Sequence, residues 1–383
     1  MRPSATRYAV IGAGLIAIAY GLARFAFGLF VPPIRDSLGL SPSAMGFIGS
    51  LPFISFVLAS FFASAAAERL GARLAAMLAG GFALIGLMLV SQSLNAWMLG
   101  VGVFSCGICT GLMMPALSLG NEAAVPLPLR GRVNAIMNAG TGTGVAVSVP
   151  AVLLLDDAWR VAYMSFGVMA AMGVVAAWRG IPAENPHAGR HEPLPRLSPQ
   201  ERRQLIRLSG FAAGMGLVSA AYWVFAPDMV VVLGEMPMQL TGWLWLMVGL
   251  VGMVGGIASE LMDRFGAAWT QSAALLGLGL AMVMLMLAPG NLPIALMSAG
   301  IFGFAYMTLT GVYLVSGIRL APRRPALGAV VAFLAVAVGQ ALGSGLAGVA
   351  AEHWGYFNTF GGFVAMGVLV ALLFPWYPLG RNA

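Results

Sequence analysis

The feature that most constrains this sequence is a succession of apolar blocks, each about 20 residues or longer, separated by short polar segments. A helix rises about 1.5 Å per residue, so about 20 apolar residues cross the roughly 30 Å hydrocarbon core of a bilayer. Of the 383 residues, 60% are hydrophobic and only 9% are charged, against about 25% charged in soluble domains. We therefore expect an all-α polytopic membrane protein. Twelve transmembrane helices are predicted, at approximately residues 8–34, 43–67, 72–92, 96–121, 131–155, 159–179, 204–233, 238–262, 268–288, 292–319, 326–351 and 356–378.

The first block also contains a pattern typical of a dinucleotide-binding turn. Gly12, Gly14 and Ala17 fit the G-x-G-x-x-A spacing of that turn. The block is too long and too uniformly apolar for a strand, a turn and a short helix, and two prolines stand where the second strand should begin. We therefore predict a membrane helix whose glycines allow close helix packing.

The distribution of arginine predicts the orientation in the membrane. The chain has no Lys, so its 20 cationic residues are all Arg. Cytoplasmic loops of membrane proteins are enriched in Arg and Lys, and with the N-terminus inside, 17 of the 20 fall on the cytoplasmic side. They are Arg2, Arg7, Arg69, Arg73, Arg130, Arg132, Arg179, Arg190, Arg196, Arg202, Arg203, Arg207, Arg264, Arg319, Arg323, Arg324 and Arg381. Both termini are thus predicted to be cytoplasmic, and the net charge of +7 requires no nucleic-acid partner.

A change in composition divides the chain into two halves. Residues 180–203 contain five prolines and many charges, which is typical of a flexible linker. We expect a six-helix bundle over residues 1–179, a cytoplasmic linker over 180–203, and a second bundle over 204–383. Ser198, Pro199 and Glu201 have the spacing of a helix N-cap, a first-turn proline and a capping box, which predicts a helix start.

The two halves align with each other at a single offset of 195 residues. This offset places Phe30, Pro32, Leu38, Gly39 and Pro42 on Phe225, Pro227, Leu233, Gly234 and Pro237. It also places Glu68, Arg69, Gly71 and Ala72 on Asp263, Arg264, Gly266 and Ala267. One ungapped shift over two helices of each half indicates an internal repeat.

Two six-helix halves, a central linker and the paired turns at residues 68–73 (ERLGAR) and 263–268 (DRFGAA) resemble the major facilitator superfamily. The stretch GLARFAFGLFVPPIRDSLGLS further resembles a branch of bacterial permeases often labelled YbfB-like. The resemblance implies a monomeric secondary transporter in the bacterial inner membrane that moves a small-molecule solute by alternating access. It also implies a cytoplasmic gate, in which Glu68 lies near Arg323 and Arg324 and Asp263 lies near Arg130 and Arg132, with Arg69 and Arg264 in the turns. The second turn has Ala268 where the family usually has a basic residue.

Polar residues inside the apolar blocks are candidates for the solute site because each is costly in a membrane. Several repeat at helical spacing, which places them on one face of a helix. The predicted substrate-binding residues are Tyr20, Arg24, Phe27, Asn138, Ser219, Tyr222, Tyr306, Tyr313 and Gln340. Each single residue has an alternative role in bonding helices together.

Arg24 is the most informative of these residues. It lies deep in the first block, where an unpaired charge costs at least about 2.5 kcal/mol. One interpretation is a structural arginine held by helix carbonyls, Asn138 or tyrosine hydroxyls. The other is that the counterion is an anionic solute such as a carboxylate, which a guanidinium binds through two parallel hydrogen bonds.

Two alternative functions remain open. A proton-driven exporter of neutral or cationic compounds would need a buried carboxylate, for which Asp228, Glu122 and Glu260 are the candidates. A polytopic membrane enzyme or sensor would need clustered catalytic groups or a soluble domain, and the sequence favours neither. A Walker A motif requires a lysine, and the chain has none, so we do not expect an ATPase that binds ATP through such a motif. Cys106 and Cys109 are interpreted as packing residues, and no cofactor or metal is expected.

Overall fold

A computed structural model describes residues 4–155, 158–183 and 197–373, and these residues contain helices and turns but no strand. Ten helical stretches within them are long and apolar enough to cross a membrane. The elements in chain order are α1 (Ala5–Ile16), a π-helical segment (Ala17–Phe25), α2 (Ala26–Leu29), α3 (Val31–Leu38), α4 (Pro42–Ser91), α5 (Ala96–Ala124), α6 (Leu127–Leu155), α7 (Trp159–Gly180), α8 (Pro199–Val232), α9 (Met238–Val254), a 3-10 turn (Gly255–Ile257), α10 (Ala258–Phe265), α11 (Ala267–Leu287), α12 (Leu292–Leu320) and α13 (Pro325–Leu373).

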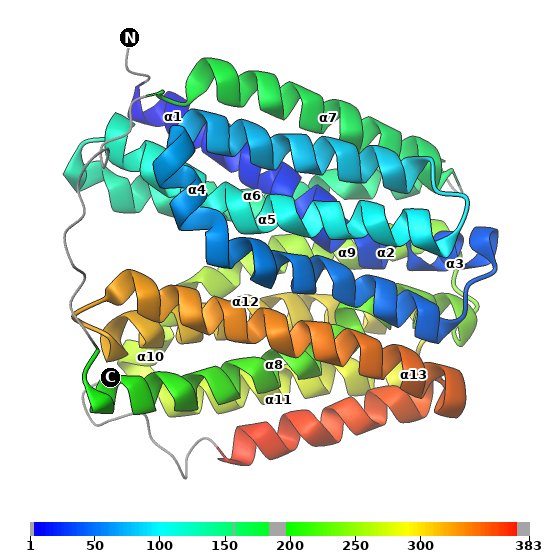
Figure 1. Cartoon of the computed structure of the whole chain (residues 1–383). Coiled ribbons are helices and arrows are strands. Elements are labelled where there is room, and N and C mark those ends of the chain that lie inside the picture. The colour runs from blue at the N-terminus through cyan, green and yellow to red at the C-terminus, as the bar shows by residue number, and fades with distance from the viewer. Residues whose placement is uncertain (1–3, 156–157, 184–196, 374–383) are drawn as a thin grey trace. The chain divides into compact units, whose positions relative to one another are not determined.

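Two of these helices, α4 and α13, are about twice as long as a membrane span. They contain 50 and 49 residues, whereas about 20 are enough to cross the hydrocarbon core. Each has one residue with non-helical backbone angles, Gly71 in α4 and Gly355 in α13, and each ribbon reverses its direction there (Figure 1). When both are divided at the glycine, the ten stretches give twelve segments, in agreement with the predicted all-α architecture.

The chain forms two compact units. The first contains Met1–Leu40 and Leu51–His191, and the second contains Ser41–Ser50 and Glu192–Ala383. In the first unit, α1 and the π-helical segment pack along α6. In the second unit, α8 packs along the first part of α13. The predicted linker, residues 180–203, lies partly outside the described residues, which resume at residue 197.

Glycines set how closely these helices approach. A Cβ atom at Gly21 would lie 2.4 Å from the Cα atom of Gly144 on α6. In the second unit, a Cβ atom at Gly216 would lie 2.0 Å from the carbonyl oxygen of Val336 on α13. Since real Cβ atoms do not approach other atoms this closely, only glycine permits these contacts. For the two glycines of the first block the outcome is divided: a Cβ atom at Gly12 would meet the Met137 side chain on α6, whereas nothing lies within 4 Å of a Cβ atom at Gly14.

The start of α8 confirms the predicted capping box. The Ser198 hydroxyl accepts a hydrogen bond from the Glu201 backbone N–H at 3.2 Å, and the Glu201 carboxylate accepts one from the Ser198 backbone N–H at 2.6 Å. Pro199 occupies the first turn, where its missing N–H costs nothing. In the first block, Gly12 and Gly14 lie within α1, so the nucleotide-binding pattern forms no strand and turn.

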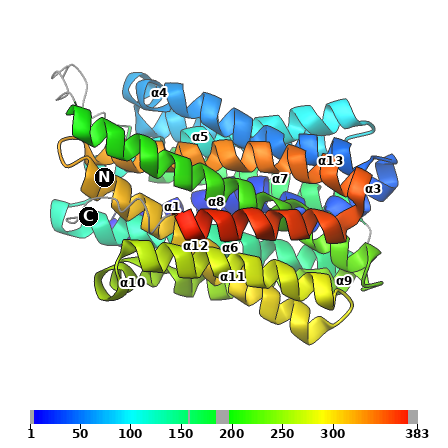
Figure 2. The ribbon, with the colours of Figure 1, turned by 90° about the horizontal axis from the view of Figure 1, so that it is seen from below.

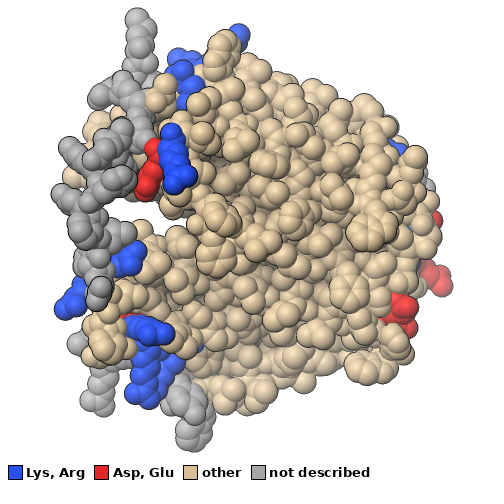
Figure 3. Space-filling model, viewed as in Figure 1, with Lys and Arg blue, Asp and Glu red and all other residues tan. Residues whose placement is uncertain are grey.

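On the face drawn in Figure 3, the exposed charged side chains lie at the ends of the helices. In the view of Figure 3, the surface between the two ends is formed by uncharged residues, and the coloured charged groups are confined to the ends. Many large apolar side chains are exposed along the helices, among them Phe61, Phe62 and Trp97 at 69, 70 and 86%. Such a surface suits a lipid environment.

Candidate substrate-binding residues

Arg24 lies in a part of the first unit where the helix departs from α-helical geometry. Ala17–Phe25 is π-helical over nine residues, a rare geometry that is frequent at functional sites. The close contact of Gly21 with Gly144 holds this segment against α6. The Arg24 side chain is only 8% exposed. The fold therefore places a permanently charged guanidinium inside the first unit.

Aromatic rings surround this guanidinium. Its Cζ atom lies 4.5 and 4.8 Å from the ring centroids of Phe53 and Phe56 on α4. The centroids of Phe25 and Tyr20, on the same helix as Arg24, lie at 5.2 and 6.0 Å. Each cation–π contact contributes about 0.5–2 kcal/mol. These rings therefore offset part of the cost of burying the charge. We call Tyr20, Arg24, Phe25, Phe53 and Phe56 the arginine site.

The other residues predicted in the first unit have different surroundings. The Tyr20 hydroxyl donates to the Thr110 carbonyl oxygen at 3.2 Å, which fixes the Tyr20 ring beside α5. Phe27 is buried and Asn138 is exposed on α6. One turn earlier on α6, the side-chain oxygen of Asn134 accepts a hydrogen bond from the Asn121 amide at 2.9 Å. Tyr20 and Arg24 are thus brought together, and Asn134 joins α6 to α5.

In the second unit, aromatic residues of α8 and α12 form a compact cluster. Tyr222 stacks on Phe302 with ring centroids 3.9 Å apart and planes inclined by 11°. Trp223 makes edge contacts with Phe302 and Tyr306, with centroids 5.4 and 5.1 Å apart. We call Tyr222, Trp223, Phe302 and Tyr306 the aromatic cluster. Aromatic pairs of this kind add about 0.5–1.5 kcal/mol each beyond burial, so the cluster stabilises the contact between α8 and α12.

Hydrogen bonds tie this cluster to α11 and α13. The Gln340 side-chain amide on α13 donates to the Tyr306 hydroxyl at 3.1 Å. The Ser298 hydroxyl donates to the Ala281 carbonyl oxygen at 2.7 Å. Because that single proton is used, the contact of 2.9 Å between Ser298 and Tyr222 has the Tyr222 hydroxyl as donor. Tyr222 and Ser298 therefore form a chain of hydrogen bonds from α8 through α12 to α11.

Two further predicted residues of this unit are buried. The Ser219 hydroxyl donates to the Gly216 carbonyl oxygen of its own helix at 3.0 Å. The Tyr313 side chain is 1% exposed and its hydroxyl has no hydrogen-bond partner among the described residues. The Ser219 hydroxyl therefore donates its proton within its own helix, whereas the Tyr313 hydroxyl can still donate a hydrogen bond to a solute.

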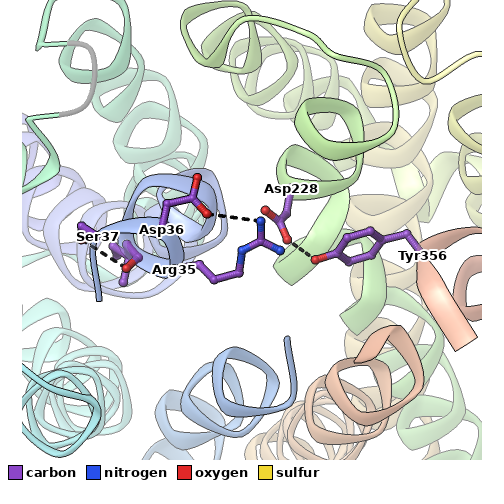
Figure 4. Close-up of polar contacts among 6 residues, drawn as sticks. Arg35, Asp36, Ser37, Asp228 and Tyr356 are labelled. Atoms are coloured by element: carbon purple, nitrogen blue, oxygen red, sulfur yellow. Dashed lines mark hydrogen bonds and ion pairs between the residues drawn. The ribbon is translucent and has the colours of Figure 1, made fainter. Parts of the chain in front are cut away.

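Among the three predicted carboxylates, Asp228 alone is buried. It is 0% exposed on α8, and the Tyr356 hydroxyl on the second part of α13 donates to it (Figure 4). Glu122 and Glu260 are exposed, and the Ser259 hydroxyl donates to the Glu260 carboxylate at 3.1 Å. The neighbouring residues Arg35 and Asp36 form an ion pair at 3.3 Å (Figure 4).

The turns of the predicted gate have contacts within their own units. Arg73, the second basic residue of the first turn, donates from Nε to the Ile181 carbonyl oxygen at 2.8 Å. Arg130 donates to the carbonyl oxygens of Val125 and Glu122 at 3.0 and 2.6 Å. Asp263 forms an ion pair with Arg319 at 2.9 Å. The predicted pairing of Glu68 and Asp263 with arginines of the other unit stays a prediction, as do the gate roles of Arg69, Arg132, Arg264, Arg323 and Arg324.

Sequence reasoning missed several of these residues. Phe53, Phe56 and Phe302 lie in apolar blocks, and a search for polar residues inside apolar blocks does not find aromatic rings. Tyr356 stands at the start of the last block and has no partner at helical spacing. Arg319 was assigned to the cytoplasmic side, but nothing in the sequence pairs it with Asp263, 56 positions away. These residues are found only once the rotation of each helix is known.

A family model described as the Major Facilitator Superfamily matches residues 13–333, which is most of the chain. The chain belongs to the Major Facilitator Superfamily. The predicted family and fold class are therefore confirmed, and the protein is a transporter of the secondary kind rather than an enzyme. Members of this superfamily are embedded in membranes, bind small molecules and are commonly monomers. The narrower likeness to YbfB-like permeases stays a prediction.

Two curated relatives match parts of the sequence. The uncharacterized transporter YycB of Bacillus subtilis (strain 168) is 28% identical over 166 residues, 42% of this chain and 41% of that protein. Sugar transport protein 8 of Arabidopsis thaliana is 32% identical over 96 residues, 25% of this chain and 19% of that protein. The chain thus spans less than half the length of each relative, so neither relative determines its solute.

Solved structures match almost the whole chain. A bacterial homologue of the human lysosomal transporter Spinster, in an inward-facing and occupied conformation, has a TM-score of 0.78 at 16% identity and covers 99% of this chain and 96% of its own. The nucleoside transporter NupG has a TM-score of 0.79 at 11% identity, covering 97 and 98%. A POT family transporter in complex with 5-aminolevulinic acid has a TM-score of 0.77 at 15% identity, covering 96% of each chain. At these identities the likeness establishes the fold.

Proposed function

We propose that this transporter moves a small organic anion, such as a carboxylate, across the bacterial inner membrane by alternating access, and that Arg24 binds the anion. The observation that carries the proposal is the burial of Arg24 among the rings of Phe25, Phe53 and Phe56. A charge maintained at this cost inside a membrane protein marks a functional site by default.

The chemistry of the guanidinium selects the class of solute. Arginine presents its donors in a rigid planar fork that matches the two oxygens of a carboxylate, and such charge-assisted bonds are about twice as strong as neutral ones. In a site that excludes water, the attraction between the charges is also less screened. We propose that Tyr20 orients Arg24 within the first unit, and that Tyr306, Gln340 and Tyr313 are the neutral hydrogen-bonding candidates of the second unit.

The experiment begins with a thermal-shift screen of carboxylates on the purified protein, because a ligand that binds the folded state raises its stability. A carboxylate found in this way is then used for counterflow in proteoliposomes. Arg24→Lys retains the charge and loses the fork, so we expect its binding constant to weaken by about tenfold or more. Arg179→Ala, at an exposed arginine of the same unit, is the matched control. Full carboxylate counterflow in Arg24→Ala would refute the assignment.

A second candidate function, proton-driven export of a neutral or cationic compound, is favoured by Asp228. This carboxylate is fully buried and accepts a hydrogen bond from Tyr356. Buried carboxylates in membrane helices often serve as proton relays. In this function Asp228 gains and loses a proton during each cycle, and Tyr356 holds the carboxylate in place.

The two functions are separated by their response to a pH gradient in proteoliposomes. If Asp228 carries the coupled proton, Asp228→Asn abolishes accumulation driven by the gradient and retains counterflow, which needs no net driving force. Tyr356→Phe retains the carboxylate and should therefore retain coupling, with a shifted pH profile. If Asp228→Asn still accumulates solute in response to the gradient, Asp228 is not the proton carrier.

A further inference from the structure

The second unit contains an apolar groove that is separate from the residues of the aromatic cluster. The groove has a volume of about 760 Å³ and is lined by residues of α9, α10, α11 and α12, which lie side by side in Figures 1 and 2. Its volume falls within the range of about 300–1,000 Å³ that is usual for small-molecule sites. Neither the family nor the proposed function assigns it a ligand.

Small residues on α11 create the space. Ala273, Ala274 and Gly277 line the groove from this helix. At Gly277, α11 approaches α12 so closely that an added Cβ atom would lie 3.3 Å from the Cβ atom of Ala305 on α12. On the other side, α9 ends at the 3-10 turn Gly255–Ile257 and α10 continues. The groove thus lies between α10 and α11 and is closed behind by α12.

The mouth of the groove is aromatic and exposed. Phe265 and Trp269 line it and are 54 and 72% exposed, and Ala273 is also exposed. Two lining residues carry hydroxyl groups, and neither makes the interior polar. The Thr270 hydroxyl donates to the Gly266 carbonyl oxygen at 2.8 Å, and the Thr308 hydroxyl oxygen is buried within the protein. The open interior therefore suits a hydrocarbon chain, and Trp and Phe at one end suit the boundary between lipid and water.

A positive charge stands at this mouth. The Arg264 guanidinium lies 5.2 Å from the ring centroid of Phe265. The neighbouring carboxylate of Asp263 already forms an ion pair with Arg319, and Glu260 accepts a hydrogen bond from Ser259. This end of the second unit carries an excess of arginines over acids, namely Arg202, Arg203, Arg207, Arg264, Arg319, Arg323 and Arg324 against Glu201, Glu260 and Asp263.

We propose that the groove binds an anionic phospholipid of the inner leaflet, such as phosphatidylglycerol, with an acyl chain along Ala273 and Gly277 and the phosphate at Arg264. The inference rests on the orientation predicted from the arginines, which places this mouth at the cytoplasmic leaflet, and does not depend on which solute is transported. Basic pockets between transmembrane helices on that side bind anionic headgroups. The charge at the mouth favours an anionic lipid over a zwitterionic one.

The test measures lipid binding to the full-length protein in detergent by native mass spectrometry, with phosphatidylglycerol and phosphatidylcholine as probes. We expect the wild type to retain phosphatidylglycerol in preference to phosphatidylcholine. Ala273→Phe fills the groove and should remove one bound lipid of either kind. Leu276→Phe, at an exposed residue of α11 that does not line the groove, is the matched control and should retain it.

Arg264→Gln tests the headgroup contact without changing the groove. One arginine near an anionic membrane surface changes the binding affinity about fivefold. We therefore expect the preference of Arg264→Gln for phosphatidylglycerol over phosphatidylcholine to fall about fivefold. The variant should still bind lipid. Equal lipid retention by the wild type and Ala273→Phe would overturn the groove assignment, and an unchanged preference in Arg264→Gln would overturn the headgroup assignment. Neither measurement uses a transported solute, so failure of the carboxylate proposal leaves both outcomes unaffected.

Discussion

Gly71 and Gly266, which lie 195 positions apart, adopt the same backbone conformation. Their φ and ψ angles are 78° and 160° for Gly71, and 83° and 153° for Gly266. Residues other than glycine rarely occupy this region, because a Cβ atom collides with the backbone there. Each glycine belongs to one of the two acid-Arg-x-Gly turns. The internal repeat is therefore visible in the backbone as well as in the sequence.

This conformation predicts the effect of adding a side chain at either turn. Gly71→Ala and Gly266→Ala should each destabilise the protein by about 1–3 kcal/mol. The cost arises from the backbone, because no atom lies within 4 Å of a Cβ at Gly266 and the nearest at Gly71 is 3.4 Å away. Thermal unfolding in detergent, followed by circular dichroism, measures it. Gly14→Ala, in α1 with open space around its Cβ, is the control and should not destabilise; equal losses in all three variants would contradict the backbone argument.

A second prediction concerns the glycines between α8 and α13. A Cβ atom at Gly339 would lie 1.9 Å from the Ala213 carbonyl oxygen, so Gly339→Ala requires the two helices to separate. We expect a loss of about 1–3 kcal/mol or more, measured by the same unfolding assay. Gly210→Ala, on α8 with nothing within 4 Å of its Cβ, adds no contact and should be neutral or slightly stabilising. A stable Gly339→Ala would show that α8 and α13 do not pack this closely.

The architecture could be predicted from the sequence, because the thickness of the hydrocarbon core sets the number of apolar residues in each membrane helix. A block of about 20 apolar residues has few alternatives to a membrane helix, and the offset of 195 residues paired Gly71 with Gly266 before any angle was known. The start of α8 was also predictable, since Ser198, Pro199 and Glu201 form a local motif. The π-helical geometry of Ala17–Phe25 was not predictable, because no local motif in the sequence marks it. The close contact of Gly21 with Gly144 within this segment was not predictable either, since the two residues lie far apart in the sequence.

The candidate site was predictable only in part, for a related physical reason. Polar residues stand out in an apolar block, so Arg24, Tyr306 and Gln340 were found. Their aromatic neighbours Phe53 and Phe302 did not stand out, because an aromatic residue suits lipid and protein interior equally well. Which of the two it contacts depends on the rotation of its helix, and a helix that is apolar on all sides does not specify that rotation.

The predicted orientation is tested with reporters that are active on one side of the membrane. A fluorescent protein that folds only in the cytoplasm, fused after Arg381, which lies outside the described residues, should be active. The same reporter inserted at residues 92–95, between α4 and α5, should be inactive, and alkaline phosphatase should give the opposite pattern at both positions. Cytoplasmic activity at residues 92–95 would overturn the orientation derived from the arginines.

The chain of hydrogen bonds from Tyr222 through Ser298 to Ala281 predicts an asymmetry between two variants. Ser298→Ala leaves the buried Tyr222 hydroxyl without its acceptor, which should cost about 1–3 kcal/mol. Tyr222→Phe removes the donor, and the Ser298 hydroxyl can still donate to Ala281, so the loss should be smaller. Thermal unfolding of both single variants and of the double variant measures the coupling. If Tyr222→Phe instead preserves stability and abolishes solute binding, Tyr222 acts on the solute rather than on the fold.

The last prediction separates the aromatic surroundings of Arg24 from the arginine itself. Phe53→Leu retains the apolar character and most of the volume of the side chain, and it removes the ring whose centroid is 4.5 Å from the guanidinium. Loss of this cation–π contact should lower the free energy of unfolding by about 0.5–2 kcal/mol, because the buried charge loses part of its stabilisation. If Arg24 binds a carboxylate, part of that loss is recovered when the anion is bound, so carboxylate affinity in Phe53→Leu should be retained or increased while stability without ligand falls. The measurement is thermal unfolding with and without the carboxylate identified by screening, and Phe47→Leu, at an exposed ring of α4, is the control. A parallel loss of stability and of affinity would instead indicate that the ring contacts the solute directly, or that Arg24 serves the fold alone.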